Sequence, residues 1–207
     1  TAGRPGDRDG LTLFLVPGDA PGLERTRTIM ADARNAANLR FEGVPVRPEA
    51  MLGIEGGGAD VLDPVLDGGR IGLAAEMLGT ATEAFERTVA YLKERRQFGQ
   101  LIGSFQGLKH RAADVFTELQ LSRSVVMDAL TALDEGREDV PQLAALAKAR
   151  MGETANLVSR EAIQMHGGIG MTDEYEIGFF LKRARVQEAA LGGERFHRDR
   201  YAALAGY

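Results

Sequence analysis

The sequence predicts a mainly α-helical protein, an up-down antiparallel helical bundle preceded by a short β segment from a partial β-domain. Three observations support this fold class. Apolar residues recur at spacings of three and four from about residue 69 onward. Strand-like patterns are confined to the region before residue 47. A glycine cluster at residues 56–58 separates the two patterns. We therefore expect a β-domain part at residues 1–55 and a helical bundle at residues 56–207.

Two strands are expected in the first part. The apolar run at residues 11–16 is stopped by Pro17 and Gly18. The second strand spans residues 38–42, and the prolines that follow it favour an edge or a strand end. Because a strand pattern begins almost at once, we expect the sequence to be a piece of a longer chain.

Five helices are expected after the glycine cluster, three long and two short. Ser104 is a candidate cap for the second, Gly136 a candidate end for it, and Pro141 lies in the first turn of the third. Helices with such wide apolar stripes bury more than one face, so we also expect an obligate oligomer. The expected ranges are 69–97, 104–136, 139–168, 173–191 and 194–204.

Composition excludes several functional classes. The chain has no cysteine, so disulfide scaffolds and thiolate metal sites are excluded, and the three histidines are too scattered in sequence for a metal-ligand motif. A net charge of −5 argues against nucleic-acid binding, and no apolar run reaches membrane-spanning length. We expect no metal, no nucleic acid, no membrane span and a cytoplasmic location.

The segment 94–99, Glu-Arg-Arg-Gln-Phe-Gly, ends the first long helix and is followed by Gln106. Arginines in the last turn of a helix interact favourably with the helix dipole, and Gly99 can simply end the helix. Alternatively, a planar guanidinium beside an aromatic ring can bind a phosphate and a heterocycle. The residues alone leave both interpretations open.

The segment 164–171, Gln-Met-His-Gly-Gly-Ile-Gly-Met, closes the third long helix. A double glycine after a helix is usually a terminator. Glycines also allow the backbone to approach a phosphate closely. The segment does not follow a strand and open a helix, so it is not a Rossmann fingerprint. A third glycine-rich stretch, residues 52–71, is either a flexible interdomain connection or part of the same pattern.

Taken in order, these segments resemble the acyl-CoA dehydrogenase family over essentially the whole sequence. Residues 10–17 and 41–46 are similar to strand segments of the family's middle domain. Arg95-Arg-Gln-Phe-Gly99, with Gln106 and Ala113-Asp114, is similar to its "R-x-x-F-G…Q…A-D" signature. His166-Gly-Gly-Ile-Gly170 resembles its "G-G-x-G" signature.

The resemblance implies an FAD-dependent oxidoreductase of fatty acid metabolism and lipid degradation. Members hold FAD between subunits and remove hydrogens from Cα and Cβ of an acyl-CoA thioester, passing electrons to an acceptor flavoprotein. By carry-over, Arg95 reaches the FAD pyrophosphate of a neighbouring subunit and Phe98 packs beside it. The residues expected to line the remaining half of the dinucleotide are Gln106, Gln164, Gly167 and Gly168.

The sequence departs from the family at the catalytic base. The usual base position holds Leu191, and the position that a minority of members use holds Gly69. Glu188 and Glu194 lie nearby, either as substitute bases or as ordinary solvated charges at helix ends.

Some family members are heteromeric, with one subunit keeping the base and its sister supplying FAD contacts. We therefore expect the sister role, in a dimer or tetramer with a homologous subunit. Two alternatives stay open. One is a homo-oligomer with a base elsewhere or with oxidase or monooxygenase chemistry. The other is a non-enzymatic helical assembly domain.

Overall fold

The structure is a computed structural model that describes residues 7–207. The chain divides into two compact units, Thr1–Leu66 and Asp67–Tyr207. Helix α1 (Gly58–Glu94) runs across the division, so the boundary lies within a helix.

The first unit contains a β-hairpin and a short strand pair. Strands β2 (Leu23–Ile29) and β3 (Asn35–Phe41) pair antiparallel, with Leu23 opposite Phe41. Strand β1 (Leu13–Phe14) pairs with β4 (Met51–Leu52), after a 3₁₀ turn at Pro48–Ala50. The strand predicted at 11–16 is thus shorter, and the one predicted at 38–42 begins and ends earlier. Strand β2 was not predicted, because its mostly polar and exposed residues do not alternate with apolar ones.

The prediction that α1 begins near residue 69 is wrong, because the helix begins at Gly58. Several glycines and Pro64 made this segment look irregular. The helix nevertheless continues through Pro64, which lies inside it. The helix also ends at Glu94 rather than Gln97, because Arg96–Gln97 (β5) pairs with Gln100–Leu101 (β6) in a small hairpin.

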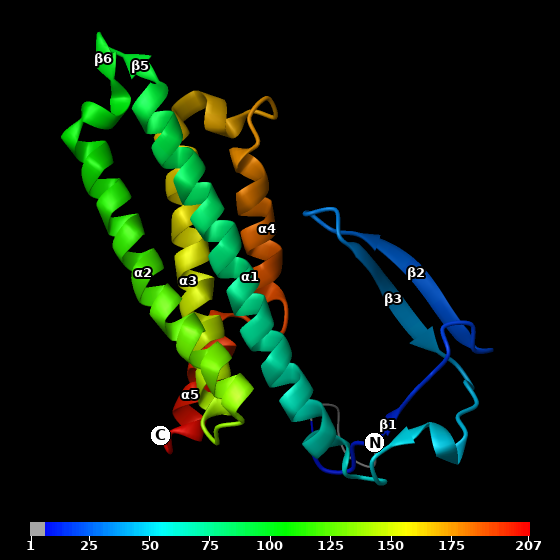
Figure 1. Cartoon of the computed structure of the whole chain (residues 1–207). Helices are drawn as coiled ribbons and strands as arrows, with labels where there is room; N and C mark the ends of the chain where they lie inside the picture. Colours follow the sequence, from blue (N-terminus) through cyan, green and yellow to red (C-terminus); the bar gives the residue numbers. More distant parts are fainter. Residues whose placement is uncertain (1–6) are drawn as a thin grey trace. The chain divides into compact units, whose positions relative to one another are not determined.

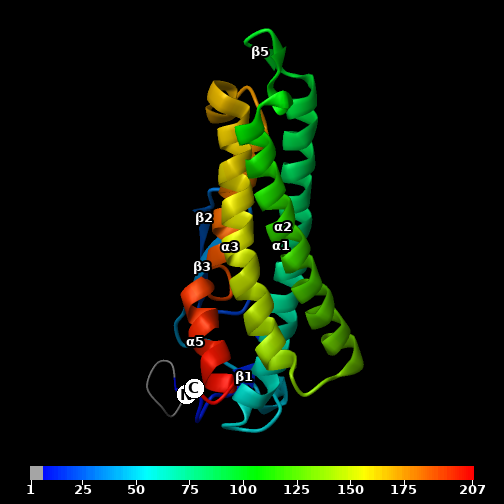
Figure 2. The same ribbon diagram turned by 90° about the vertical axis from the view of Figure 1, so that its left-hand side faces the viewer.

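The second unit is the predicted antiparallel bundle. Helices α2 (Gln106–Glu135) and α3 (Val140–His166) are joined by a short connection. Figures 1 and 2 both show α1, α2 and α3 side by side along most of their length. The shorter helices α4 (Ile177–Ala189) and α5 (Glu194–Leu204) pack against α3. The fold class is therefore confirmed, and α4 is shorter at both ends than predicted.

The helix ends distinguish the correct cap predictions from the wrong one. Gly136 adopts a left-handed conformation with φ 66°, and its N–H bonds to the Ala132 and Leu133 carbonyls, so it is the C-cap of α2. Pro141 lies in the first turn of α3 as predicted. Ser104 does not cap α2. Its hydroxyl donates to the Leu101 carbonyl at 2.7 Å within a 3₁₀ turn, Ile102–Ser104.

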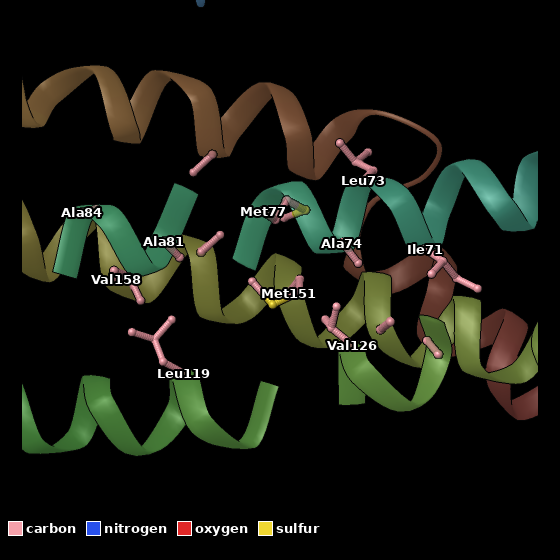
Figure 3. Close-up of a cluster of buried hydrophobic side chains, with 14 of the residues drawn as sticks. Ile71, Leu73, Ala74, Met77, Ala81, Ala84, Leu119, Val126, Met151 and Val158 are labelled. Carbon is pink, nitrogen blue, oxygen red and sulfur yellow. The ribbon is translucent and has the colours of Figure 1, made fainter. Parts of the chain in front are cut away.

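The core is formed by small and medium side chains from α1, α2 and α3 (Figure 3). Helix α3 has 15 buried residues among its 27, many of them alanine, and contacts α2, α4 and α5. A helix that is buried on nearly all sides is the centre of its bundle. Its small side chains let the neighbouring helices approach closely. Labelled members of the core in Figure 3 include Ile71, Ala74, Met77, Leu119, Val126, Met151 and Val158.

Two methionines provide a test of this core. Met151 is fully buried on α3, whereas Met127 on α2 is 56% exposed. We expect Met151→Ala to lower the free energy of unfolding by about 2–5 kcal/mol, because it leaves a cavity. We expect Met127→Ala to change it by less than about 0.5 kcal/mol. Denaturant unfolding measures both, and equal effects would contradict the assignment of the core.

Candidate functional site

A cavity of about 510 Å³ lies where the ends of α1 and α3 meet the β5–β6 hairpin and the start of α2. In Figure 1 this is the end of the bundle marked by the labels β5 and β6. Five of the six predicted cofactor-binding residues line it, and Gln106 does not, although its neighbours Phe105 and Leu108 do. The structure thus brings together segments that are some 70 residues apart in the chain, as the sequence numbers show. The five lining residues are Arg95, Phe98, Gln164, Gly167 and Gly168.

The α1 side of the cavity carries an exposed cation and an exposed aromatic ring. The Arg95 N–H still bonds to the Tyr91 carbonyl at 2.9 Å, so this side chain leaves from the last turn of the helix. Among the residues that the structure describes, none pairs with the Arg95 guanidinium. Phe98 is 90% exposed, has a φ of 54°, and contacts the ring of Phe105 edge-on at 6.1 Å. A bulky residue held exposed in a left-handed turn is unusual, and such residues cluster where a ligand or partner binds.

The α3 side of the cavity carries the glycines. Gly167 has φ 67° and ψ −143°, a conformation that only glycine adopts without strain. A Cβ built on Gly168 would have no atom within 4 Å, so open space lies in front of this backbone. A Cβ on Gly170 would instead lie 2.7 Å from the Ile163 carbonyl oxygen. Gly167 and Gly168 therefore leave the backbone accessible, while Gly170 is required by packing.

Two residues of the cavity wall, Tyr91 and His166, were not among the predicted site residues. Their rings stack with centroids 4.3 Å apart, and His166 Nδ1 bonds to the Ala162 carbonyl at 2.7 Å. Burial lowers the pKa of His166, so the neutral ring donates from Nδ1. Tyr91 could have been found from the sequence, because it lies one helical turn before Arg95 and shares its face.

A second cluster joins the two positions that the sequence analysis predicts as seats of a catalytic base. Gly69 on α1 and Leu191 after α4 are far apart in sequence, yet a Cβ built on Gly69 would lie 3.2 Å from Leu191 Cδ1. Leu191 is 40% exposed and has a φ of 57°. Neither residue carries an ionisable group. This pair of positions, Gly69 and Leu191, is called the Leu191 seat below, and it cannot accept a proton from a ligand.

The nearby glutamates make contacts elsewhere. Glu188 accepts a hydrogen bond from Asn156 Nδ2 at 2.9 Å, and Glu194 pairs with Arg198 Nε at 2.9 Å. A Cβ built on Gly152 of α3 would lie 3.7 Å from side-chain atoms of both glutamates. Both side chains therefore start close to α3, but only the Glu188 carboxylate bonds to a residue of that helix, Asn156.

Buried polar groups surround the Leu191 seat. Asp67, 2% exposed, pairs at 2.8 Å with both Arg70 and Arg200. Burial lowers the pKa of Lys148 to about 8, and the charge of Glu188 partly opposes this effect. Burial lowers the pKa of His197 to about 4, and the charge of Lys148 adds to this effect. At neutral pH His197 is therefore uncharged and Lys148 is mostly protonated.

Residues 7–207 contain neither a metal-ligand cluster nor a helix suited to cross a membrane. No group of three or more histidine or acidic side chains lies close enough together to bind a metal ion. No helix in this range combines the length and the apolar character that a membrane crossing needs.

The sequence model described as "Acyl-CoA dehydrogenase, C-terminal domain" matches residues 56–205. The chain belongs to the acyl-CoA dehydrogenase family. The match covers both the cavity and the Leu191 seat, so the resemblance seen in the sequence motifs is confirmed.

Three similar proteins illustrate the relationship. The rat mitochondrial short/branched chain specific acyl-CoA dehydrogenase is 36% identical over 88% of this chain and 43% of its own. The solved butyryl-CoA dehydrogenase of Megasphaera elsdenii superposes with a TM-score of 0.92 at 29% identity, over 99% of this chain and 54% of its own. A structure described under "Electron transferring flavoprotein of Acidaminococcus fermentans" has a TM-score of 0.89 at 32% identity, over 95% and 52%. The chain thus spans about half the length of these relatives.

The neutral state of His197 gives a pH prediction. Between its ordinary value of 6.5 and about 4, the unfolded chain binds a proton at His197 that the folded chain does not. Stability should therefore fall as the pH falls through this window, by up to about 3 kcal/mol from this group. His197→Asn removes the titration and keeps a side-chain N–H.

Denaturant unfolding at pH 7, 6, 5 and 4 measures the difference between the two proteins. The buried His166 titrates in both, so its contribution cancels. A variant that loses as much stability as the wild type between pH 6.5 and 4 would show that His197 is not held neutral.

Proposed function

We propose that this chain is part of an FAD-dependent acyl-CoA dehydrogenase, in which it contributes the distal FAD site but lacks the catalytic base. One observation carries the first half of the proposal. Five residues predicted from two separate motifs line one cavity, at Arg95, Phe98, Gln164, Gly167 and Gly168. The second half rests on the apolar pair at Leu191 and Gly69.

The residues present fit the phosphate part of FAD. A diphosphate needs a cation and accessible backbone N–H groups. The unpaired Arg95 guanidinium can supply the first, and the open backbone at Gly167 and Gly168 can supply the second. Phe98 offers an apolar face beside the cation. FAD, when bound, accepts the hydride taken from the acyl chain.

The exposed position of Phe98 fits a site that is completed by another chain. A residue that is 90% exposed at a hairpin tip gains little from its own bundle. We propose that it contacts FAD held by a homologous subunit, in a homo- or hetero-oligomer. The proposed substrate is an acyl-CoA, and the proposed electron acceptor is a flavoprotein.

The seat at Leu191 and Gly69 supports the non-catalytic role. Removing a proton from the α-carbon needs a base within hydrogen-bonding reach, and leucine has no lone pair to offer. Glu188 is bonded to Asn156 of α3, and Glu194 pairs with Arg198 of its own helix α5. The base is therefore proposed to come from the homologous subunit.

Arg95→Ala tests the FAD site. Removing a charged donor to phosphate should weaken FAD binding about 10- to 100-fold. Arg96→Ala is the matched control, because Arg96 is the next residue, is also exposed, and does not line the cavity. Flavin fluorescence titration of the full-length protein with its homologous subunit measures both. If the two variants bind FAD equally, the proposed site is wrong, and a purely structural bundle is favoured.

Leu191→Glu tests the missing base. The full-length protein with FAD, kept anaerobic, should not bleach its flavin with butyryl-CoA or 2-methylbutyryl-CoA. Leu191→Glu should accelerate bleaching by about 100-fold or more, which is within the usual range for a general base. Leu191→Gln, of the same size but without a basic carboxylate, should not.

Co-expression of a homologous subunit with an intact base should also restore bleaching. Bleaching by the unmodified chain alone would show that it has its own base and would overturn the non-catalytic role. Flavin reduction by a substrate other than an acyl-CoA, followed by oxygen consumption when air is admitted, would favour oxidase chemistry instead.

A further inference from the structure

The turn at residues 190–193 joins α4 to α5 and carries Leu191. Side chains from three different helices donate hydrogen bonds to backbone carbonyls in and next to this turn. The carbonyls belong to Glu188, Leu191 and Gly192. Such a dense set of side-chain donors on one short turn goes beyond ordinary helix capping.

Lys148 of α3 binds both sides of the turn. Its Nζ donates to the Glu188 carbonyl at 2.8 Å and to the Gly192 carbonyl at 3.0 Å. The Glu188 carbonyl is among the last four of α4, which have no partner within the helix. Lys148 is only 1% exposed, and a cation this buried is retained at a large desolvation cost. Its two bonds therefore bracket Leu191 from within the core.

The Leu191 carbonyl, between these two points, binds two further donors. His197 Nε2 of α5 lies 3.0 Å from it, and Arg70 Nε of α1 lies 3.4 Å from it. With all three carbonyls turned inward, Leu191 adopts its φ of 57°. A left-handed conformation strains a non-glycine residue, so it persists only where the surroundings enforce it.

The inward orientation of these three carbonyls determines the direction of the Leu191 side chain. Leu191 is 40% exposed and lies against Gly69, where a Cβ would be 3.2 Å from its Cδ1. Reversal of φ at this residue would swing the side chain away from Gly69. The hydrogen bonds to these backbone carbonyls thus determine whether the side chain at position 191 lies against Gly69.

We propose that Lys148 is a positioning residue, which holds the turn at residues 190–193 and thereby directs the side chain at position 191 toward Gly69. It acts on position 191 through backbone carbonyls. The role of this direction in proton transfer rests on the proposed function, but the conformational role does not.

A double-mutant cycle tests the conformational role. Leu191→Gly should raise the folding equilibrium constant by about fivefold or more, because glycine relieves the strain of a positive φ. In a Lys148→Met background the turn can relax, so the gain from Leu191→Gly should be at least about fivefold smaller. Methionine keeps the length of the side chain and removes the charge and the donors.

Thr154→Val is the matched control. Thr154 is also buried on α3, 1% exposed, and its hydroxyl bonds to Ser122 at 2.7 Å, away from the turn. In this background the gain from Leu191→Gly should stay within about twofold of the wild type. If Lys148→Met does not fold, Lys148→Gln provides the same cycle with a shorter donor. Additivity of the Lys148 and Leu191 changes would overturn the proposal.

A second readout concerns flavin reduction in the Leu191→Glu protein. Adding Lys148→Met should slow bleaching by butyryl-CoA at least about tenfold, while the Kd for butyryl-CoA changes less than threefold. Adding Thr154→Val should leave both unchanged. An equal loss of rate with Thr154→Val would show a general structural effect and overturn the positioning role. If Leu191→Glu bleaches in no background, the proposed function fails, while the folding cycle still decides the role of Lys148.

Discussion

The burial of α3 on nearly all sides is the constraint on which the rest of the bundle depends. Six of its 15 buried residues are alanine and another is Gly152, so neighbouring helices can approach closely. Helices α2, α4 and α5 contact it directly, and Tyr91 of α1 stacks on its last residue, His166. The few polar groups within it must then find partners from those neighbours, as Thr154 does with Ser122 and Lys148 does with the α4–α5 turn.

This central helix also connects the two candidate sites. Its C-terminal end supplies Gln164 and His166 to the cavity, and its N-terminal half supplies Lys148 to the turn that carries Leu191. Eighteen residues of helix separate Lys148 from His166, about 27 Å at the usual rise per residue. A helix packed on all sides does not bend easily, so the spacing between the sites is set by α3. A change at position 191 can therefore leave the cavity at the other end of α3 in place.

The sequence predicted most of what depends on local periodicity and little of what depends on tertiary contacts. The apolar repeats predicted the helices. The end of α2 was predictable because glycine readily adopts the left-handed conformation that Gly136 has there. The start of α1 was missed because its glycines and Pro64 have low helix propensity. Similarly, the hairpin at Arg96–Leu101 depends on two successive left-handed residues, one of them a phenylalanine.

At the candidate sites, sequence motifs indicated which residues lie together only for the cavity. The proximity of Gly69 and Leu191 is a tertiary fact that no spacing in the sequence encodes. Lys148 could have been noticed as a lone charge between alanines in an otherwise apolar run. Its partners could not, because they are backbone carbonyls that any sequence would supply.

The glycines after α3 differ in how freely they can change over evolution. Gly170 faces the Ile163 backbone so closely that any side chain displaces the chain, so stability alone opposes every substitution there. Gly168 has open space in front of it and no positive φ, so stability alone does not require glycine. Constancy at position 170 among relatives would thus report packing. Constancy at position 168 would report selection by a ligand, and in lineages that no longer bind a dinucleotide this position should drift first.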